Sequence, residues 1–112
     1  MSEDAGKRRL RESKRRFTAT LVAQGYRVST FDCEPFHLLA RKGRQAKAIR
    51  ICFGYTETDD ILSVSREPMP DRCRREIWQI ADGGRTIVIV KIKGLQKAKE
   101  QLNRKALKLV KG

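Results

Sequence analysis

The period of the apolar residues switches along this chain between that of a helix and that of a strand, and this switching restricts the fold more than any other sequence feature. The predicted helices, which have apolar residues three or four positions apart, cover residues 8–24, 58–66 and 95–112. The predicted strands, which are short apolar blocks between turn residues, cover residues 26–31, 36–40, 46–53, 73–81 and 85–93. This αβββαββα order predicts an α/β (α+β) fold in which helices flank one mixed β-sheet.

Four local features of this pattern make specific predictions. Residues 41–45 are expected to form a basic turn between the second and third strands. Asp82-Gly83-Gly84 before the apolar run 86–92 is typical of a β-hairpin, although residues 71–80 are also compatible with a helix capped by Asp71. Thr58, which is followed by two Asp residues, is expected to cap the second helix. The face of the first helix that is expected to be buried consists of Leu10, Phe17, Leu21 and Val22.

The length of 112 residues predicts one domain over 1–112, with a flexible start at 1–7 and a basic helix at 95–112. No apolar run approaches the roughly 20 residues that span a bilayer. Residues 1–16 hold seven Lys or Arg and no apolar stretch, unlike a secretory signal peptide. Three widely spaced Cys residues form an odd number, which is typical of reduced thiols. We therefore expect a cytoplasmic protein that does not contact a membrane.

The net charge of +13 is concentrated at the two ends of the chain. Residues 1–50 carry 13 basic and 5 acidic side chains, residues 51–94 carry seven of each, and residues 95–112 carry six and one. Such an imbalance favours a polyanionic partner, so we expect binding to DNA or RNA. The candidate nucleic-acid-binding residues are Arg8, Arg9, Arg11, Arg15, Arg16, Arg27, Arg41, Lys42, Arg44, Lys47 and Arg50. Because no base-reading motif is present, we expect recognition of nucleic-acid shape.

Three stretches of the chain resemble the small archaeal Holliday-junction resolvases, which are restriction-endonuclease-like nucleases. The stretches are Gly25-Tyr26-Arg27-Val28, Pro35-Phe36-His37-Leu38-Leu39-Ala40 and Ile49-Arg50-Ile51-Cys52. The resemblance covers residues 8–93 and implies a restriction-endonuclease-like mixed β-sheet flanked by helices. It also implies DNA rather than RNA as the ligand, and a homodimer with the hairpin or the last helix at its interface.

The catalytic residues of that family are not found at the matching positions. The family places an Asp on the second strand, and a Glu two residues before a Lys on the third, to hold a metal ion and the attacking water. These positions carry His37, Arg50 and Cys52 here, and Glu12 is the nearest counterpart of an acid on the family's first helix. Mg²⁺ prefers oxygen ligands. We therefore predict a non-catalytic, nuclease-like protein that has lost its metal site and needs no cofactor.

Two alternatives for the whole protein remain open. The first is an active Mg²⁺- or Mn²⁺-dependent endonuclease or junction resolvase, whose carboxylates have migrated to Glu12, Asp32 and Glu34. The second is an adaptor whose basic face binds an acidic protein.

Several single residues also have two interpretations. Arg27 and Arg50 are candidates for binding phosphate in the former catalytic cleft, and Arg50 could instead face solvent. His37, in an apolar strand, is expected to be a hydrogen-bonded structural residue. Alternatives are a zinc site, in which Cys33 and His37 would meet the other two cysteines, and a nucleophilic pair of Cys52 with His37. Trp78 is expected in the core, with base stacking as the alternative.

Overall fold

The computed structural model describes residues 5–31, 34–70 and 72–94. Its elements are α1 (Ala5–Ala23), β1 (Arg27–Thr30), β2 (Leu38–Lys42), β3 (Gln45–Phe53), α2 (Thr58–Arg66), β4 (Cys73–Ala81), the 3₁₀ turn η1 (Asp82–Gly84) and β5 (Thr86–Ile92). The predicted mixed α/β class is confirmed. The predicted last helix at 95–112 lies outside the described residues, as do Asp32 and Cys33. No helix in the described part is long and apolar enough to cross a membrane.

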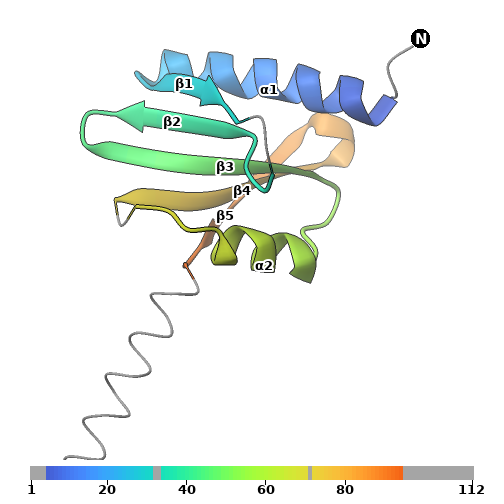
Figure 1. The fold of residues 1–112 in the computed structure, drawn as a ribbon. Helices are drawn as coiled ribbons and strands as arrows, with labels where there is room; N and C mark the ends of the chain where they lie inside the picture. Colours follow the sequence, from blue (N-terminus) through green and yellow to red (C-terminus); the bar gives the residue numbers. More distant parts are fainter. Residues whose placement is uncertain (1–4, 32–33, 71, 95–112) are drawn as a thin grey trace, which may run out of the picture.

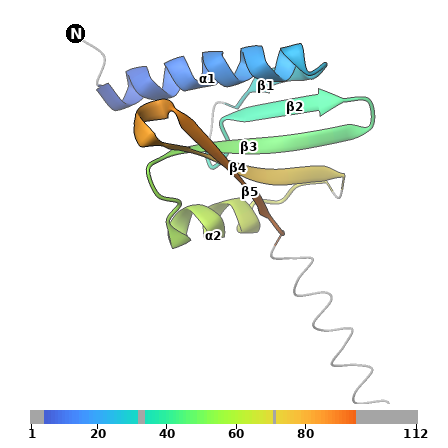
Figure 2. The ribbon, with the colours of Figure 1, turned by 180° about the vertical axis from the view of Figure 1, so that it is seen from behind.

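The five strands form one sheet in the order β1-β2-β3-β4-β5. Neighbouring strands are antiparallel except for β3 and β4, which are parallel and are joined through α2. Figures 1 and 2 show α1 along one side of the sheet and α2 on the other. A three-layer arrangement results, in which each face of the sheet is partly covered by one helix.

Alternation along the strands supplies a separate core to each face. On the α1 face, Phe17 and Leu21 pack on a cluster that includes Ile49 and Trp78. The Phe17 and Trp78 rings meet edge to face at a centroid distance of 4.9 Å, which confirms the predicted core position of Trp78. On the other face, Val64 of α2 packs in a second cluster with Phe36, Ala48, Cys52 and Ile77.

The second strand begins two residues later than predicted. The register pairs Thr30 of β1 with Leu38, so the ladder starts at Leu38 instead of at Phe36. The ladder then continues through Lys42, and the chain turns at Gly43 and Arg44. Gly43 has a positive φ of 60°, which glycine adopts without strain. The predicted basic turn between these strands is confirmed, but it is shorter than the predicted five residues because Arg41 and Lys42 belong to β2 and Gln45 belongs to β3.

Three further predictions need correction. Residues 73–81 are a strand that pairs on both sides, so the helical alternative for 71–80 is wrong. The N-cap of α2 is Glu57 instead of Thr58, since Asp60 Oδ2 accepts a hydrogen bond from the Glu57 backbone N–H at 3.1 Å. Val22 is 56% exposed, because α1 contacts the sheet through a narrow strip that includes the adjacent Leu21 but not Val22.

Candidate nucleic-acid interface

Helix α1 presents arginines on the side that faces away from the sheet. The helix carries seven basic side chains and one acidic side chain, Glu12. Arg8, Arg11 and Arg15 are exposed and lie on one stripe at spacings of three and four, opposite the buried Phe17. Along the axis, Arg8 and Arg15 are about 10 Å apart at 1.5 Å per residue. Such a stripe can contact several phosphates of one strand.

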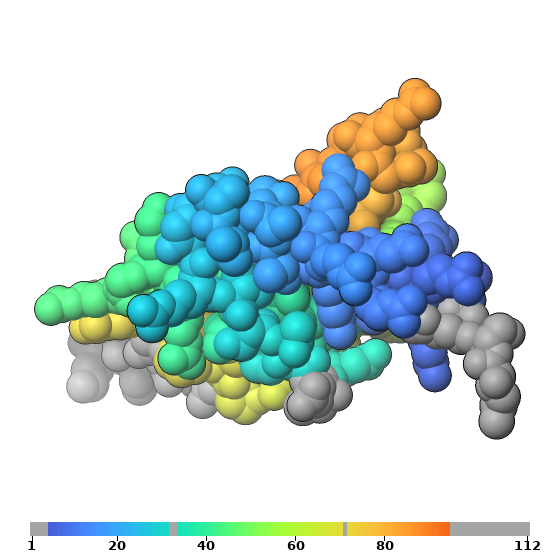
Figure 3. Space-filling view, turned by 90° about the horizontal axis from the view of Figure 1, so that it is seen from above, coloured from blue at the N-terminus to red at the C-terminus, as the bar shows by residue number. Residues whose placement is uncertain are grey.

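The β2–β3 turn continues this basic surface beyond the C-terminal end of α1. Lys42 Nζ donates a hydrogen bond to the Gln24 carbonyl at 2.8 Å, which holds the turn against the end of the helix. Arg44 is exposed at the tip. The space-filling view in Figure 3 shows α1 and this green tip on the same side of the molecule.

On the opposite face of the sheet, two arginines are neighbours across strands. Arg27 on β1 is the cross-strand partner of Arg41 on β2, and both are exposed. Neither has an ion-pair partner among the described residues. Like charges directly opposite each other destabilise an antiparallel pair. An anionic ligand at this edge would relieve that repulsion.

Lys47 is not part of this exposed surface, although its position next to the turn predicts that it is. Its Nζ lies 3.7 Å from Glu76 Oε1 and 4.7 Å from the centre of the Tyr26 ring. Glu76 is 4% exposed and also accepts a hydrogen bond from Trp78 Nε1 at 3.0 Å. Lys47 therefore acts as the counter-ion of a buried carboxylate.

The positions that match the resolvase catalytic residues come together in space, except for one. His37 lies just before β2, and Arg50 and Cys52 lie on β3. All three are close to Asp60 of α2. Glu12 is separate, because it lines a pocket on the α1 side of the sheet. Asp60 was missing from the predicted site, since its sequence context indicates only an acidic residue in the first turn of a helix.

Arg50 is held inside the fold by α2 and the loop before β2. Its Nε donates to Asp60 Oδ1 at 2.9 Å, and its Nη1 donates to the Pro35 carbonyl at 2.8 Å. The side chains of Arg50 and Asp60 are 18% and 19% exposed. Both the solvent-facing alternative and a role as an uncommitted phosphate ligand disagree with this geometry.

His37 is a hydrogen-bonded structural residue, as its sequence context predicts. Its Nδ1 accepts a hydrogen bond from the Ile51 backbone N–H at 2.8 Å, so the neutral ring carries its proton on Nε2. Burial, and then the charges of Arg50 and Lys14, lower the pKa of His37 from 6.5 to about 4, while Asp60 opposes the shift. The ring is thus neutral at physiological pH.

Cys52 is a buried thiol within the core. Burial, followed by the nearby Asp60 carboxylate, raises its pKa. Because a thiol must ionise to attack, this environment opposes the alternative in which Cys52 is a nucleophile. Cys73 contacts the same core cluster, and burial likewise raises its pKa. Cys33, the third ligand of the zinc alternative, lies outside the described residues.

The metal site implied by the resemblance does not fit these residues. His37 Nδ1 is already an acceptor for the Ile51 N–H, and Arg50 places a permanent cation where a resolvase has a carboxylate. The Asp60 carboxylate binds that cation and the Glu57 N–H. Within the described ranges, no three His, Cys, Asp or Glu side chains form a group that could hold a metal ion.

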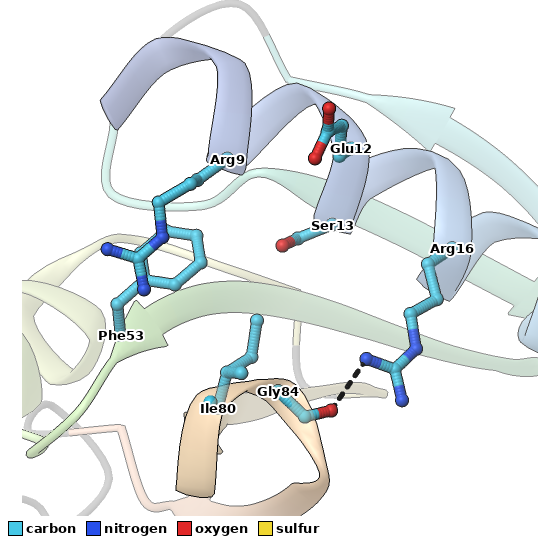
Figure 4. A pocket seen from close by; sticks show the side chains of 8 residues that line it. Arg9, Glu12, Ser13, Arg16, Phe53, Ile80 and Gly84 are labelled. Atoms are coloured by element: carbon cyan, nitrogen blue, oxygen red, sulfur yellow. Dashed lines mark hydrogen bonds between the residues drawn. The ribbon is translucent and has the colours of Figure 1, made fainter. Parts of the chain in front are cut away.

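Two other arginines of α1, which are also exposed, line a pocket between the helix and the end of the sheet. Arg9 and Arg16 stand at its two ends, and the Ser13 side chain lies between them (Figure 4). The opposite wall is formed by Phe53, Ile80 and the η1 turn. The sequence predicts an arginine-rich helix but does not separate these two arginines from the outward stripe.

Scans of this chain against protein-family models, curated proteins and solved structures find no match. The function is therefore inferred from the geometry of the described residues and from the sequence resemblance.

Proposed function

We propose that this protein binds nucleic acid, with DNA as the favoured ligand, and does not cut it. The observation that carries the proposal is the basic surface made by the outward side of α1 and the β2–β3 turn. It combines the stripe of Arg8, Arg11 and Arg15 with Arg44 at the tip of the turn. The like-charged neighbours Arg27 and Arg41 form a second basic patch on the opposite face of the sheet. The preference for DNA over RNA comes from the resolvase resemblance alone.

Electrostatics explain why such a surface favours a polyanion. Clustered cations repel one another and hold counter-ions, and a strand of phosphates neutralises them while releasing counter-ions from the nucleic acid. The arginines of this surface lie on α1 and on the hairpin turn beyond its end, so their contacts can follow a phosphate backbone.

The absence of cleavage is supported by what replaces the catalytic residues. The Arg50 guanidinium pairs with the Asp60 carboxylate and also donates a hydrogen bond to the Pro35 carbonyl. His37 accepts a hydrogen bond from the Ile51 backbone N–H of β3. These side chains stabilise the sheet and α2, and they leave neither a carboxylate pair nor a free base at the matching positions.

A salt-series gel shift without divalent metal tests the binding. The ligands are a four-way junction, a matched duplex and a single strand, and wild type is compared with the triple variant Arg8→Gln, Arg11→Gln, Arg15→Gln. Each lost phosphate contact should lower the slope of log K against log salt on duplex by about 0.9, so the triple variant should lose about 2–3. The matched control removes three exposed arginines outside this surface, Arg66, Arg72 and Arg85, and should keep the wild-type slope.

Three results would contradict parts of the proposal. Equal slopes for the two triple variants would remove α1 from the interface. No binding to any ligand at low salt would overturn the nucleic-acid function and leave the adaptor for an acidic protein. Strand cleavage after addition of Mn²⁺ to the same samples would overturn the non-catalytic part, and loss of that cleavage in Glu12→Ala or Glu34→Ala would identify the migrated carboxylates.

The second partner that we propose is another copy of this chain, at the β5 edge of the sheet. Among the described residues, β5 pairs only with β4, and its Val88 and Ile89 are 43% and 48% exposed. An apolar edge strand is a template for pairing with another strand. The hairpin is also one of the two interfaces that the resolvase resemblance implies.

A further inference from the structure

The pocket between α1 and the η1 turn has features that a purely electrostatic phosphate surface does not need. It has a volume of about 230 Å³ and an apolar floor of Phe53 and Ile80. Its size is below the roughly 300–1,000 Å³ of pockets for drug-sized ligands, and it suits a group as small as one nucleobase. Figure 4 shows that its rim is polar, with side chains of α1 above the floor.

The two arginines of the pocket are held in place before any ligand binds. The guanidinium carbon of Arg9 lies 4.5 Å from the centre of the Phe53 ring. Arg16 Nη1 donates a hydrogen bond to the Gly84 carbonyl at 2.9 Å. Since each guanidinium is already positioned, less conformational freedom is lost when it binds a ligand.

The chemistry of the lining favours a whole nucleotide over a free phosphate. Arg9 and Arg16 attract a phosphate, and the Arg9 guanidinium offers a plane on which a base can stack. The carboxylate of Glu12 also lines the pocket and would repel a phosphate, but it can accept a hydrogen bond from an exocyclic amino group of a base. Ile80 and Phe53 supply the apolar contact that a base requires.

We infer that this pocket binds one unpaired nucleotide, with its base against Ile80 and the Arg9 guanidinium that is stacked on Phe53, and with its phosphate at Arg16. This inference rests on the proposed function and adds a ligand class to it. A base inside a duplex is stacked and paired, so only single-stranded DNA, a strand end or an opened junction can present the ligand. The outward stripe then follows the backbone, while the pocket distinguishes unpaired from paired DNA.

The test separates the base from the phosphates. Fluorescence anisotropy compares a 5′-labelled single strand of deoxycytidines with an abasic strand of the same length, which has the same phosphates and no bases. Wild type should bind the deoxycytidine strand about tenfold more tightly, since stacking of one base typically contributes a factor of about 5 to 150. Ser13→Phe keeps every charge and fills the pocket, so it should bind both strands equally.

Matched variants on the same helix exclude general effects. Ala19→Phe adds the same ring at an exposed position outside the pocket and should keep the tenfold preference. Arg15→Gln and Arg9→Gln each remove one charge from α1, and only Arg9→Gln, which also removes the plane on which the base stacks, should reduce the preference. The Arg15 and Arg9 pair decides the question if Ser13→Phe does not fold, which circular dichroism would show.

The outcomes distinguish this inference from the proposed function. If wild type binds neither strand at low salt, the proposed function fails. If wild type binds both strands equally, or if folded Ser13→Phe keeps the preference for bases, the pocket inference is overturned while DNA binding stands. A preference that survives in Ser13→Phe would be assigned to another aromatic surface such as Tyr55, which is 89% exposed at the same end of the sheet.

Discussion

The stability of this protein should depend on pH through one side chain, because His37 is the only histidine among the 112 residues. In the folded state, His37 Nδ1 accepts a hydrogen bond from the Ile51 N–H and therefore cannot hold a proton without breaking that bond. Its pKa is lowered from 6.5 to about 4. Between these two values, the unfolded chain binds a proton that the folded chain does not. The contribution of His37 is thus complete above about pH 7 and is lost as the pH falls toward 4.

The size of the effect follows from the same two pKa values. A change from pH 7.5 to pH 5 should lower the free energy of unfolding by about 2 kcal/mol if the whole shift is expressed. The ring is only partly buried, so solvent screening reduces the expected loss to about 1 kcal/mol. This loss is a measurable part of the roughly 5–15 kcal/mol typical of a folded domain.

Urea unfolding at pH 7.5 and pH 5 measures this loss, with His37→Asn as the reference. The Asn side-chain oxygen can still accept the Ile51 N–H, but it does not titrate in this range. The variant should therefore lose about 1 kcal/mol less than wild type between the two pH values. Equal losses would refute the assignment. An NMR titration of the ring should also show a higher pKa in Arg50→Met, since Arg50 is the largest electrostatic cause of the lowered value.

Three other predictions concern stability and assembly. Arg50→Met should lower the free energy of unfolding by about 2 kcal/mol, because the partly buried Asp60 carboxylate loses its cation. The double variant Arg50→Met, Asp60→Asn should recover part of that loss, and a double-mutant cycle that shows no coupling would contradict the ion pair. Arg75→Met should cost about 1–2 kcal/mol in urea unfolding, since Arg75 donates to two carbonyls at the end of α2, and it should leave DNA binding unchanged. Ile89→Lys should convert a dimer to a monomer in sedimentation velocity, while Val22→Lys, at another exposed apolar position, should not; a wild-type monomer would exclude the β5 interface.

The order of helices and strands over residues 5–92 could be predicted from the sequence because hydrophobic period is a local property. Phe17 and Leu21 share one helical face, and the alternation along residues 46–53 places Ile49 and Ile51 on one side of a strand. The same locality explains the errors. Val22 differs from Leu21 by one position on the helix, and only the width of the contact with the sheet shows which of them is buried.

The sequence alone therefore determined the class of most of the described elements, the basic character of α1 and the core position of Trp78, while the strand at 73–81 was decided by its pairing with β3 and β5. Only the tertiary structure showed that Arg50 meets Asp60, that His37 meets the Ile51 N–H and that Lys47 meets Glu76. It also divided the arginines of α1 between an outward stripe and a pocket. These contacts join side chains of different elements, so they depend on the strand register and on the placement of two helices over the sheet, which no local period encodes.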